Sequence, residues 1–184
     1  MNLSLFPDTA DIARLAIPIT PVIDYTVRAL CVSPYPGHKK GCPNVGKCDR
    51  CPPMAPLFDQ HFDMSQPFFA VVNEFNLAGH VERIRERKTD WSDAQLRCCL
   101  YWQPTARKAL EAKINQVMQA EQFQGYDVTR CPEGMGMNVT ETLRQAGIDL
   151  EWPPVRIVRQ VAVMGRRLKT AYCQCGWSGL PESR

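Results

Sequence analysis

The sequence predicts a single α+β domain over residues 1–184, with a small sheet of about three or more strands, three to four helices and a long loop rich in cysteine and proline. Three observations support this class. Stretches rich in β-branched and aromatic residues, which favour strands, recur along the chain. Other stretches repeat apolar residues at the period of a helix. Six prolines within residues 31–57 exclude regular structure there, because proline removes backbone donors.

The first half of the chain is expected to contain two strands on either side of that loop. Residues 1–21 contain three prolines and are expected to form a peripheral arm. Residues 21–30 (PVIDYTVRAL) and 68–77 (FFAVVNEFNL) predict strands. Residues 31–57 are too long for an unsupported loop in a compact domain, which indicates that the loop is functional and is held in place.

The helices are expected in the second half. A short basic helix is predicted over residues 77–88, and Ser92 and Gln95 have the spacing of a capping box, which predicts a helix that begins there and continues through residue 100. Pro104 is expected to break or restart this helix, and the apolar spacing predicts helix again over residues 106–124.

The last third is expected to contain one more helix and one more strand. The helix is predicted from residue 138 to Gly147, which suits a left-handed C-terminal cap. The strand is predicted over residues 155–164. Residues 170–184, which include Cys173 and Cys175, are expected to form a peripheral tail.

Composition indicates a cytoplasmic protein with reduced thiols. A chain of 184 residues with 45% hydrophobic residues can bury a core without disulfides, and its nine cysteines are an odd number. No basic start followed by an apolar run is visible at the N-terminus, and no stretch is apolar enough to span a membrane. Only three histidines occur, so any metal chemistry is expected to depend on sulfur.

The cysteines of the long loop have the pattern of metal ligands. Cys48 and Cys51 form a Cys-x-x-Cys pair, whose spacing lets two thiolates bind one metal or adjacent irons. Cys42, Cys51 and Cys131 are each followed by proline, as is familiar from iron–sulfur ligands of bacterial ferredoxins. A thioredoxin-like redox pair would instead open a helix after a strand, and reduced cysteines buried in proline-rich turns are the plainer alternative.

Cys131 lies about 80 residues beyond the first group, in a loop expected to precede a helix. We expect folding to bring this loop over the first one, so that Cys42, Cys48, Cys51 and Cys131 hold a metal, with Cys31 as a further candidate ligand. Four thiolates would close the site, whereas three would leave an open position. Glu133 is the candidate acid, base or extra ligand at the cofactor, and a helix-capping role is its alternative.

Two kinds of centre fit these ligands. Zinc takes four thiolates, typically from two Cys-x-x-Cys-like pairs, and this chain has one such pair. The uneven spacing and the Cys-Pro pairs favour a [4Fe–4S] cluster instead. Cys98 and Cys99 point about 100° apart on a helix and are expected to pack in the core. Cys173 and Cys175 are expected either to bind a second metal or to lie in an exposed tail.

Two blocks of the sequence resemble a predicted metal-binding, cysteine-rich family of unknown function from prokaryotes. The blocks are Gly-Cys-Pro-Asn-x-Gly…Cys-Pro-Pro at 41–53 and Cys-Pro-Glu-Gly-Met-Gly-Met-Asn-Val-Thr-Glu-Thr-Leu-Arg-Gln-Ala-Gly at 131–147. The resemblance implies a small α+β domain with cysteine ligands, Cys42, Cys51 and Cys131 first among them, for an iron–sulfur cluster. The chain lacks the further ferredoxin-like cysteine run that members of that family carry between the two blocks.

Several functions are compatible with such a centre. The first is a redox, sulfur-handling or accessory role toward a small molecule or a protein redox partner. The alternative is a zinc-stabilised module that binds nucleic acid or protein, and a purely structural metal is the third. The chain has no phosphate loop, nucleotide fingerprint or catalytic triad, so the sequence assigns no reaction.

Overall fold

The computed structural model describes residues 12, 14–34, 39–42, 45–47 and 49–169, and it confirms the α+β class. The described chain contains a four-stranded antiparallel sheet in the order β1-β2-β4-β3. The strands are β1 (Ala16–Ile19), β2 (Phe68–Asn76), β3 (Tyr126–Thr129) and β4 (Ile157–Arg166). The expected peripheral tail at 170–184 lies outside the described residues.

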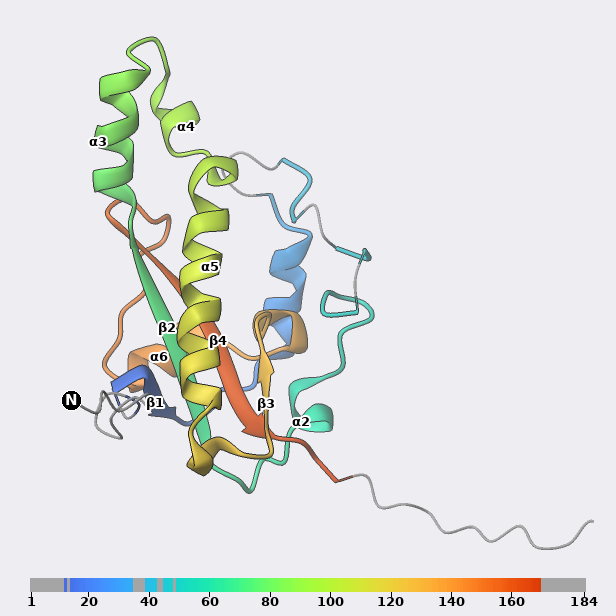
Figure 1. Ribbon diagram of the computed structural model, residues 1–184. Helices are drawn as coiled ribbons and strands as arrows, with labels where there is room; N and C mark the ends of the chain where they lie inside the picture. The colour runs from blue at the N-terminus through green and yellow to red at the C-terminus, as the bar shows by residue number, and fades with distance from the viewer. Residues whose placement is uncertain (1–11, 13, 35–38, 43–44, 48, 170–184) are drawn as a thin grey trace, which may run out of the picture.

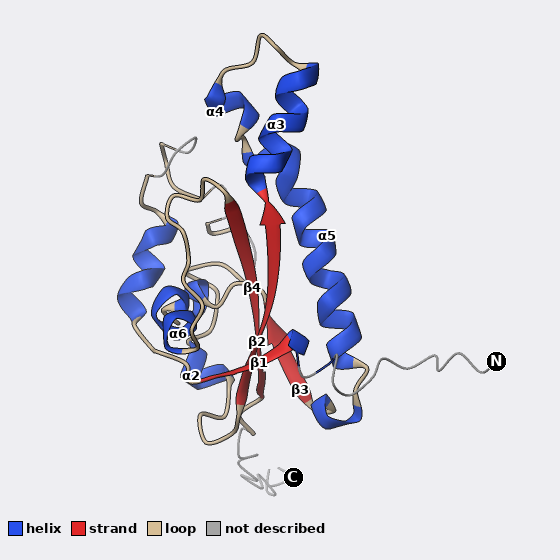
Figure 2. Ribbon diagram, turned by 90° about the vertical axis from the view of Figure 1, so that its left-hand side faces the viewer, coloured by secondary structure: helices blue, strands red, loops and turns tan. Residues whose placement is uncertain are grey.

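Helices lie on both faces of this sheet (Figures 1 and 2). The α-helices are α2 (Phe58–His61), α3 (Leu77–Arg87), α4 (Asp93–Leu96), α5 (Cys99–Met118) and α6 (Val139–Gln145), and the 3-10 helices are η1 (Tyr25–Cys31), η2 (Glu121–Phe123) and η3 (Glu133–Met135). In Figure 2, α5 lies on one side of the sheet, and α2 and α6 lie on the other.

The two central strands place the core on both faces of the sheet. Ala70 and Val71 are neighbours in β2, and their side chains point to opposite faces, as they must in a strand. Val71 packs in a cluster with Ile114 of α5, whereas Ala70 packs with Leu143 of α6. The buried amide of Asn73 donates to the carbonyl of Ala106 in α5, 3.1 Å away, so α5 is also attached to the sheet by a polar contact.

The strands predicted over 68–77 and 155–164 are confirmed as β2 and β4, the latter displaced by two residues toward the C-terminus. They pair over eight positions, from Phe69 opposite Met164 to Asn76 opposite Ile157. This pair forms the centre of the sheet.

The strand predicted over 21–30 is wrong. Ile23 makes only an isolated bridge to Met137, and residues 25–31 form the 3-10 helix η1. The carboxylate of Asp24 accepts from the backbone N–H of Thr26 at 3.0 Å, and this turn overrides the strand preference of the β-branched residues that follow.

The arm expected over residues 1–21 is also partly wrong, because residues 16–19 form β1 at the edge of the sheet. Pro18 lies opposite Phe69 in the pairing with β2. Proline is tolerated there because an edge strand leaves one side of its backbone without a ladder partner. Residues 1–11 and 13 lie outside the described chain.

The helices follow the local pattern, with two exceptions. The basic helix is confirmed as α3, and the capping box is confirmed, with the Ser92 hydroxyl accepting from the N–H of Gln95. The predicted continuation of this helix through residue 100 is wrong, because α4 ends at Leu96 and α5 begins anew at Cys99. Pro104 lies inside a continuous α5 instead of breaking it. Proline in the second turn removes only the hydrogen bond to the carbonyl of Leu100, while buried residues farther along anchor the helix to the sheet.

The helix predicted from residue 138 is confirmed as α6, followed by Gly147 at φ +78°. The helix predicted over 106–124 ends earlier, at Met118, and continues as a turn of 3-10 helix, η2. β3, α2 and η3 were not predicted.

Within the described part of the chain, no helix has both the length and the apolar character needed to cross a bilayer.

Candidate metal centre

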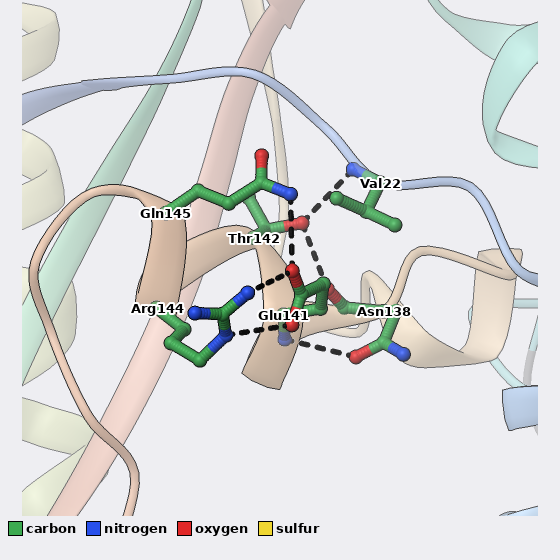
Figure 3. Close-up of polar contacts among 6 residues, drawn as sticks. All are labelled: Val22, Asn138, Glu141, Thr142, Arg144 and Gln145. Carbon is green, nitrogen blue, oxygen red and sulfur yellow. Dashed lines mark hydrogen bonds and ion pairs between the residues drawn. The ribbon is translucent and has the colours of Figure 1, made fainter.

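The cysteine-bearing segments gather in one part of the molecule, which we call the cysteine lobe and define as residues 25–57 together with residues 131–136. The start of α6 holds its two halves together. The backbone N–H of Asn138 donates to the carbonyl of Val22 at 2.8 Å. The buried hydroxyl of Thr142 accepts from the N–H of Val22 at 3.0 Å and donates to the carbonyl of Asn138 at 2.7 Å (Figure 3). Residues far apart in the sequence are therefore joined beside the lobe.

The 3-10 helices η1 and η3 pack directly on each other. The N–H of Asp24 donates to the carbonyl of Gly136 at 2.8 Å. Gly136 has φ +94°, and a Cβ added there would lie 2.3 Å from a ring carbon of Tyr25. Only glycine satisfies both the positive φ and this contact. The close approach places the end of η1, at Cys31, in the same lobe as Cys131.

Cys31 and Cys42 are neighbours. The backbone N–H of Cys42 donates to the carbonyl of Cys31 at 2.7 Å. Gly41 has φ +76°, and a Cβ there would lie 2.7 Å from the same carbonyl oxygen. Gly41 therefore lets the backbone turn tightly and brings the loop back onto the end of η1.

The residues on either side of Cys51 lie against Gly134, three residues after Cys131. A Cβ added to Gly134 would lie 3.1 Å from the carbonyl oxygen of Arg50, 3.4 Å from Cδ of Pro52 and 3.7 Å from Cβ of Cys131. The residues on both sides of Cys51 and the Cys131 side chain thus converge on one point. Both thiols are partly buried.

Negative charge is disfavoured inside the lobe. Burial raises the pKa of the Cys31 thiol, the nearby Cys42 and Glu133 raise this pKa further, and the Arg28 guanidinium opposes them. Burial also raises the pKa of the Glu133 carboxyl. These shifts place Cys31, Cys42 and Glu133 within electrostatic range of one another. A bound cation would reverse them, because it favours the deprotonated form of each group.

Two arginines support the lobe. Arg28 donates from Nη2 to the carbonyls of Ala55 at 3.1 Å and Pro53 at 3.4 Å, so η1 is attached to the chain that follows Cys51. Arg130 forms a two-point ion pair with Glu111 of α5, with 2.6 Å between Nη2 and Oε2. This pair raises the pKa of Arg130 and connects the residue before Cys131 to the long helix.

The expected ligands are therefore brought together in part. Cys31 and Cys42 are neighbours through a backbone hydrogen bond, and the residues that flank Cys51 lie near the loop of Cys131. Cys48 lies outside the described residues. Within the described ranges, no group of three or more cysteine, histidine, aspartate or glutamate side chains is arranged to hold a metal ion. Glu133 does not cap α6, because Asn138 does so with its side chain. Glu133 instead begins η3, where its carboxyl interacts with its own backbone N–H.

The remaining candidates lie elsewhere. Cys99 begins α5 and packs against the buried cluster around Trp102, in agreement with a core role. Cys98 is partly exposed at the N-cap of α5, and none of the core clusters of the described residues includes it, so the core expectation holds for Cys99 alone. Cys173 and Cys175 lie outside the described residues. The histidine at 61 bonds to a carboxylate, with 2.8 Å between Nε2 and Oδ2 of Asp127.

Sequence reasoning missed the residues that shape the lobe without carrying sulfur. Gly134 and Gly136 flank Met135 in the second cysteine block, so their spacing next to Cys131 was the available indication of close backbone approach. Arg28 carried no such indication, because its partners lie 25 and 27 residues away.

Three comparisons with known proteins gave no match: no family profile, no curated protein and no solved structure matches this chain. The resemblance of the two cysteine blocks to a metal-binding family therefore stays a prediction.

Proposed function

We propose that this chain carries a cysteine-ligated metal centre, namely a [4Fe–4S] cluster, in a redox, sulfur-handling or accessory role. The proposed ligands are Cys42, Cys51 and Cys131, with Cys48 or Cys31 as the fourth. Glu133 is the proposed acid, base or extra ligand beside the centre. A small molecule or a protein redox partner would be its counterpart, and the reducing cytoplasm would keep the thiols available.

One observation carries the proposal. Cysteines from segments about 80–100 residues apart in the sequence lie in one lobe with Glu133, and the surroundings there raise the pKa of the Cys31 thiol and of the Glu133 carboxyl. Such a group of anions is costly by itself and becomes favourable when a cation neutralises it. The donor set fits a metal that prefers sulfur.

The kind of centre is inferred from the ligand pattern. The Cys-Pro pairs and the uneven spacing support an iron–sulfur cluster over zinc, which typically uses two Cys-x-x-Cys-like pairs. Such a cluster supplies one-electron transfer or, with an open iron, a Lewis acid. The residues of the lobe would bind it, exclude water with the packed η1 and η3, and set its potential through backbone N–H groups and the buried carboxyl.

The direct test is purification of the full chain without air, followed by an absorption spectrum and metal analysis. The proposal expects brown protein that contains iron and acid-labile sulfide. Colourless protein with stoichiometric zinc would contradict the cluster and support the alternative, a zinc-stabilised binding module. Protein that contains no metal after reconstitution with either iron and sulfide or zinc would contradict the metal centre.

Substitution separates a ligand from a bystander. Cys51→Ser is expected to remove most of the metal, because it deletes a proposed ligand. The matched control is Cys98→Ser, which makes the same chemical change at the N-cap of α5, where serine is well accommodated. Equal metal content in both variants and in the unaltered chain would count against Cys51 as a ligand.

A further inference from the structure

The cysteine lobe is positively charged. It contains five basic residues and two acidic residues, a net charge of +3. Residues 156–169 form a second basic segment, with five basic residues and no acidic residue, and the remaining residues carry a net charge of −5, so that the whole chain has a net charge of +3. The lobe is therefore a basic region of a chain whose overall charge is small.

These basic side chains face solvent beside well-anchored backbone. Lys39, Lys40 and Lys47 are exposed. Lys40 precedes Gly41, which is packed against Cys31 and Val32, and Lys47 follows Gly46, whose N–H donates to the carbonyl of Pro52 at 2.9 Å. The lysines therefore project from turns that the lobe holds in place. Arg50 is also exposed, and its charge helps to lower the pKa of Glu111.

The same lobe exposes aliphatic side chains. Leu30 is 63% exposed, Val32 is 61% exposed and Met54 is 53% exposed. Val32 lies against Gly41, next to Lys40, and Arg28 bonds to the carbonyls on both sides of Met54. In Figure 1 the segments that carry these residues lie to the right of the sheet and α5, on the outside of the molecule. We call Leu30, Val32 and Met54, with Lys39, Lys40 and Lys47, the basic face.

We propose that the basic face docks an acidic protein surface. Apolar side chains surrounded by charged ones form the usual plan of a protein interface, in which the centre excludes water and the rim selects the partner by charge. Nucleic acid is the other large polyanion, but single strands are bound by stacking on aromatic rings. Leu30, Val32 and Met54 carry no ring, and the ring of Tyr25, which is 39% exposed, lies against Gly136. The inference goes beyond the proposed function, because it concerns the surface around the thiols and not the metal.

Binding to model polyanions tests the proposal. The probe is a fluorescein-labelled peptide in which leucines are spaced among glutamates, followed by anisotropy at low and physiological salt. Its controls are the same peptide with serine in place of leucine and an oligothymidylate of equal charge. The leucine peptide is expected to bind the intact chain most tightly, and binding should weaken as salt is added, because exposed charges are screened.

Charge reversal then locates the site. Lys40→Glu with Lys47→Glu is expected to weaken binding of the leucine peptide by about tenfold or more, since loss of charge complementarity slows association and adds repulsion. The matched control is Arg83→Glu with Arg87→Glu on α3, which makes the same change in net charge at other exposed positions and is expected to leave binding within about twofold. Circular dichroism checks the fold of each variant.

Three outcomes overturn the proposal. Tighter binding of the oligothymidylate would indicate a nucleic-acid surface. Equal losses of affinity in the two double variants would mean that only the net charge of the chain matters. Equal binding of the leucine and serine peptides would mean that Leu30, Val32 and Met54 contribute nothing to binding. Metal content is measured on the same samples, so the two proposals can fail separately. Protein that holds no metal but still binds the leucine peptide would contradict the proposed metal centre and leave the docking surface supported.

Discussion

The layer formed by α5 and the sheet differs from the cysteine lobe in what holds it together. α5 buries Trp102, Ala106, Leu110, Ile114 and Val117, most of them against the sheet. In the cysteine lobe, Gly41 and Ala55 are the buried residues among the described positions of 25–57. Residues 131–136 are more buried, and Met135 packs with Ala55 in the cluster around Phe58. Every residue of η1 is at least partly exposed.

The difference shows that residues 25–57 of the lobe rely on specific contacts, whereas the sheet layer relies on burial of apolar area. Hydrophobic burial contributes about 25 cal/mol per Å² and tolerates some change in shape. The lobe instead depends on backbone hydrogen bonds, on glycines that permit close approach and on arginine bonds to carbonyls. Such a region gains most from a ligand that cross-links its segments, as the proposed metal would.

The largest effect is expected from the sheet layer. Trp102→Ala removes a buried ring that stacks on Phe75 and whose Nε1 donates to the carbonyl of Arg97 at 3.1 Å. We expect a loss of about 3–5 kcal/mol in the free energy of unfolding, as for other large aromatic residues. Urea denaturation followed by circular dichroism measures it. A loss below about 1 kcal/mol would contradict the view that apolar burial dominates this layer.

The next effect tests the contact between η1 and η3. Gly136→Ala is expected to cost about 2–4 kcal/mol, since an alanine at positive φ costs about 1–2 kcal/mol and its Cβ would overlap the Tyr25 ring. Gly147→Ala is the matched control, because φ there is also positive, at +78°, and the added Cβ would have nothing within 4 Å. Equal losses in the two variants would mean that the close approach to Tyr25 contributes nothing.

A smaller effect, dependent on pH, is expected at the end of the sheet. Burial tends to raise the pKa of Asp127, but hydrogen bonds from Arg167, His61 and the Val128 N–H outweigh it and lower the pKa below its usual value of 3.8. The folded pKa lies below the unfolded one, so the carboxylate stabilises the fold above about pH 4, and this contribution is lost as the pH falls through the folded pKa.

Asp127→Ala is therefore expected to lower the free energy of unfolding near neutral pH by about 1–2 kcal/mol, the range for hydrogen bonds to a partly exposed charged group. Urea titrations from neutral pH down to about pH 3 give the difference between the variant and the unaltered chain. This difference should shrink on acidification. A difference that grows as the pH falls would show that the sign is wrong.

The smallest effect is expected in the lobe. Leu30→Ala changes a side chain that is 63% exposed and is expected to alter the free energy of unfolding by less than about 0.5 kcal/mol. Thermal unfolding of the two proteins under identical metal loading measures it. A loss comparable to that of Trp102→Ala would place Leu30 in a core and contradict the contrast between the two regions.

Elements with local causes were predictable from the sequence. The capping box of α4, the Asn138 cap of α6 and the β-branched and aromatic residues of β2 each lie within a few positions of one another, so their patterns are visible in the chain. The same holds for the Cys-Pro pairs and the Cys-x-x-Cys spacing, which identify the candidate ligands.

Contacts between distant segments were decided by the folded chain. Residues 16–19 form a strand because β2 offers them an edge, and residues 25–31 form a helix despite their β-branched side chains, because Asp24 begins a turn and Ile23 meets only Met137. Likewise, the approach of Cys131 to the flanks of Cys51 depends on Gly134 and on the attachment of α6 to Val22. The two sides of each such contact lie far apart in sequence, so no local pattern records which segments will meet.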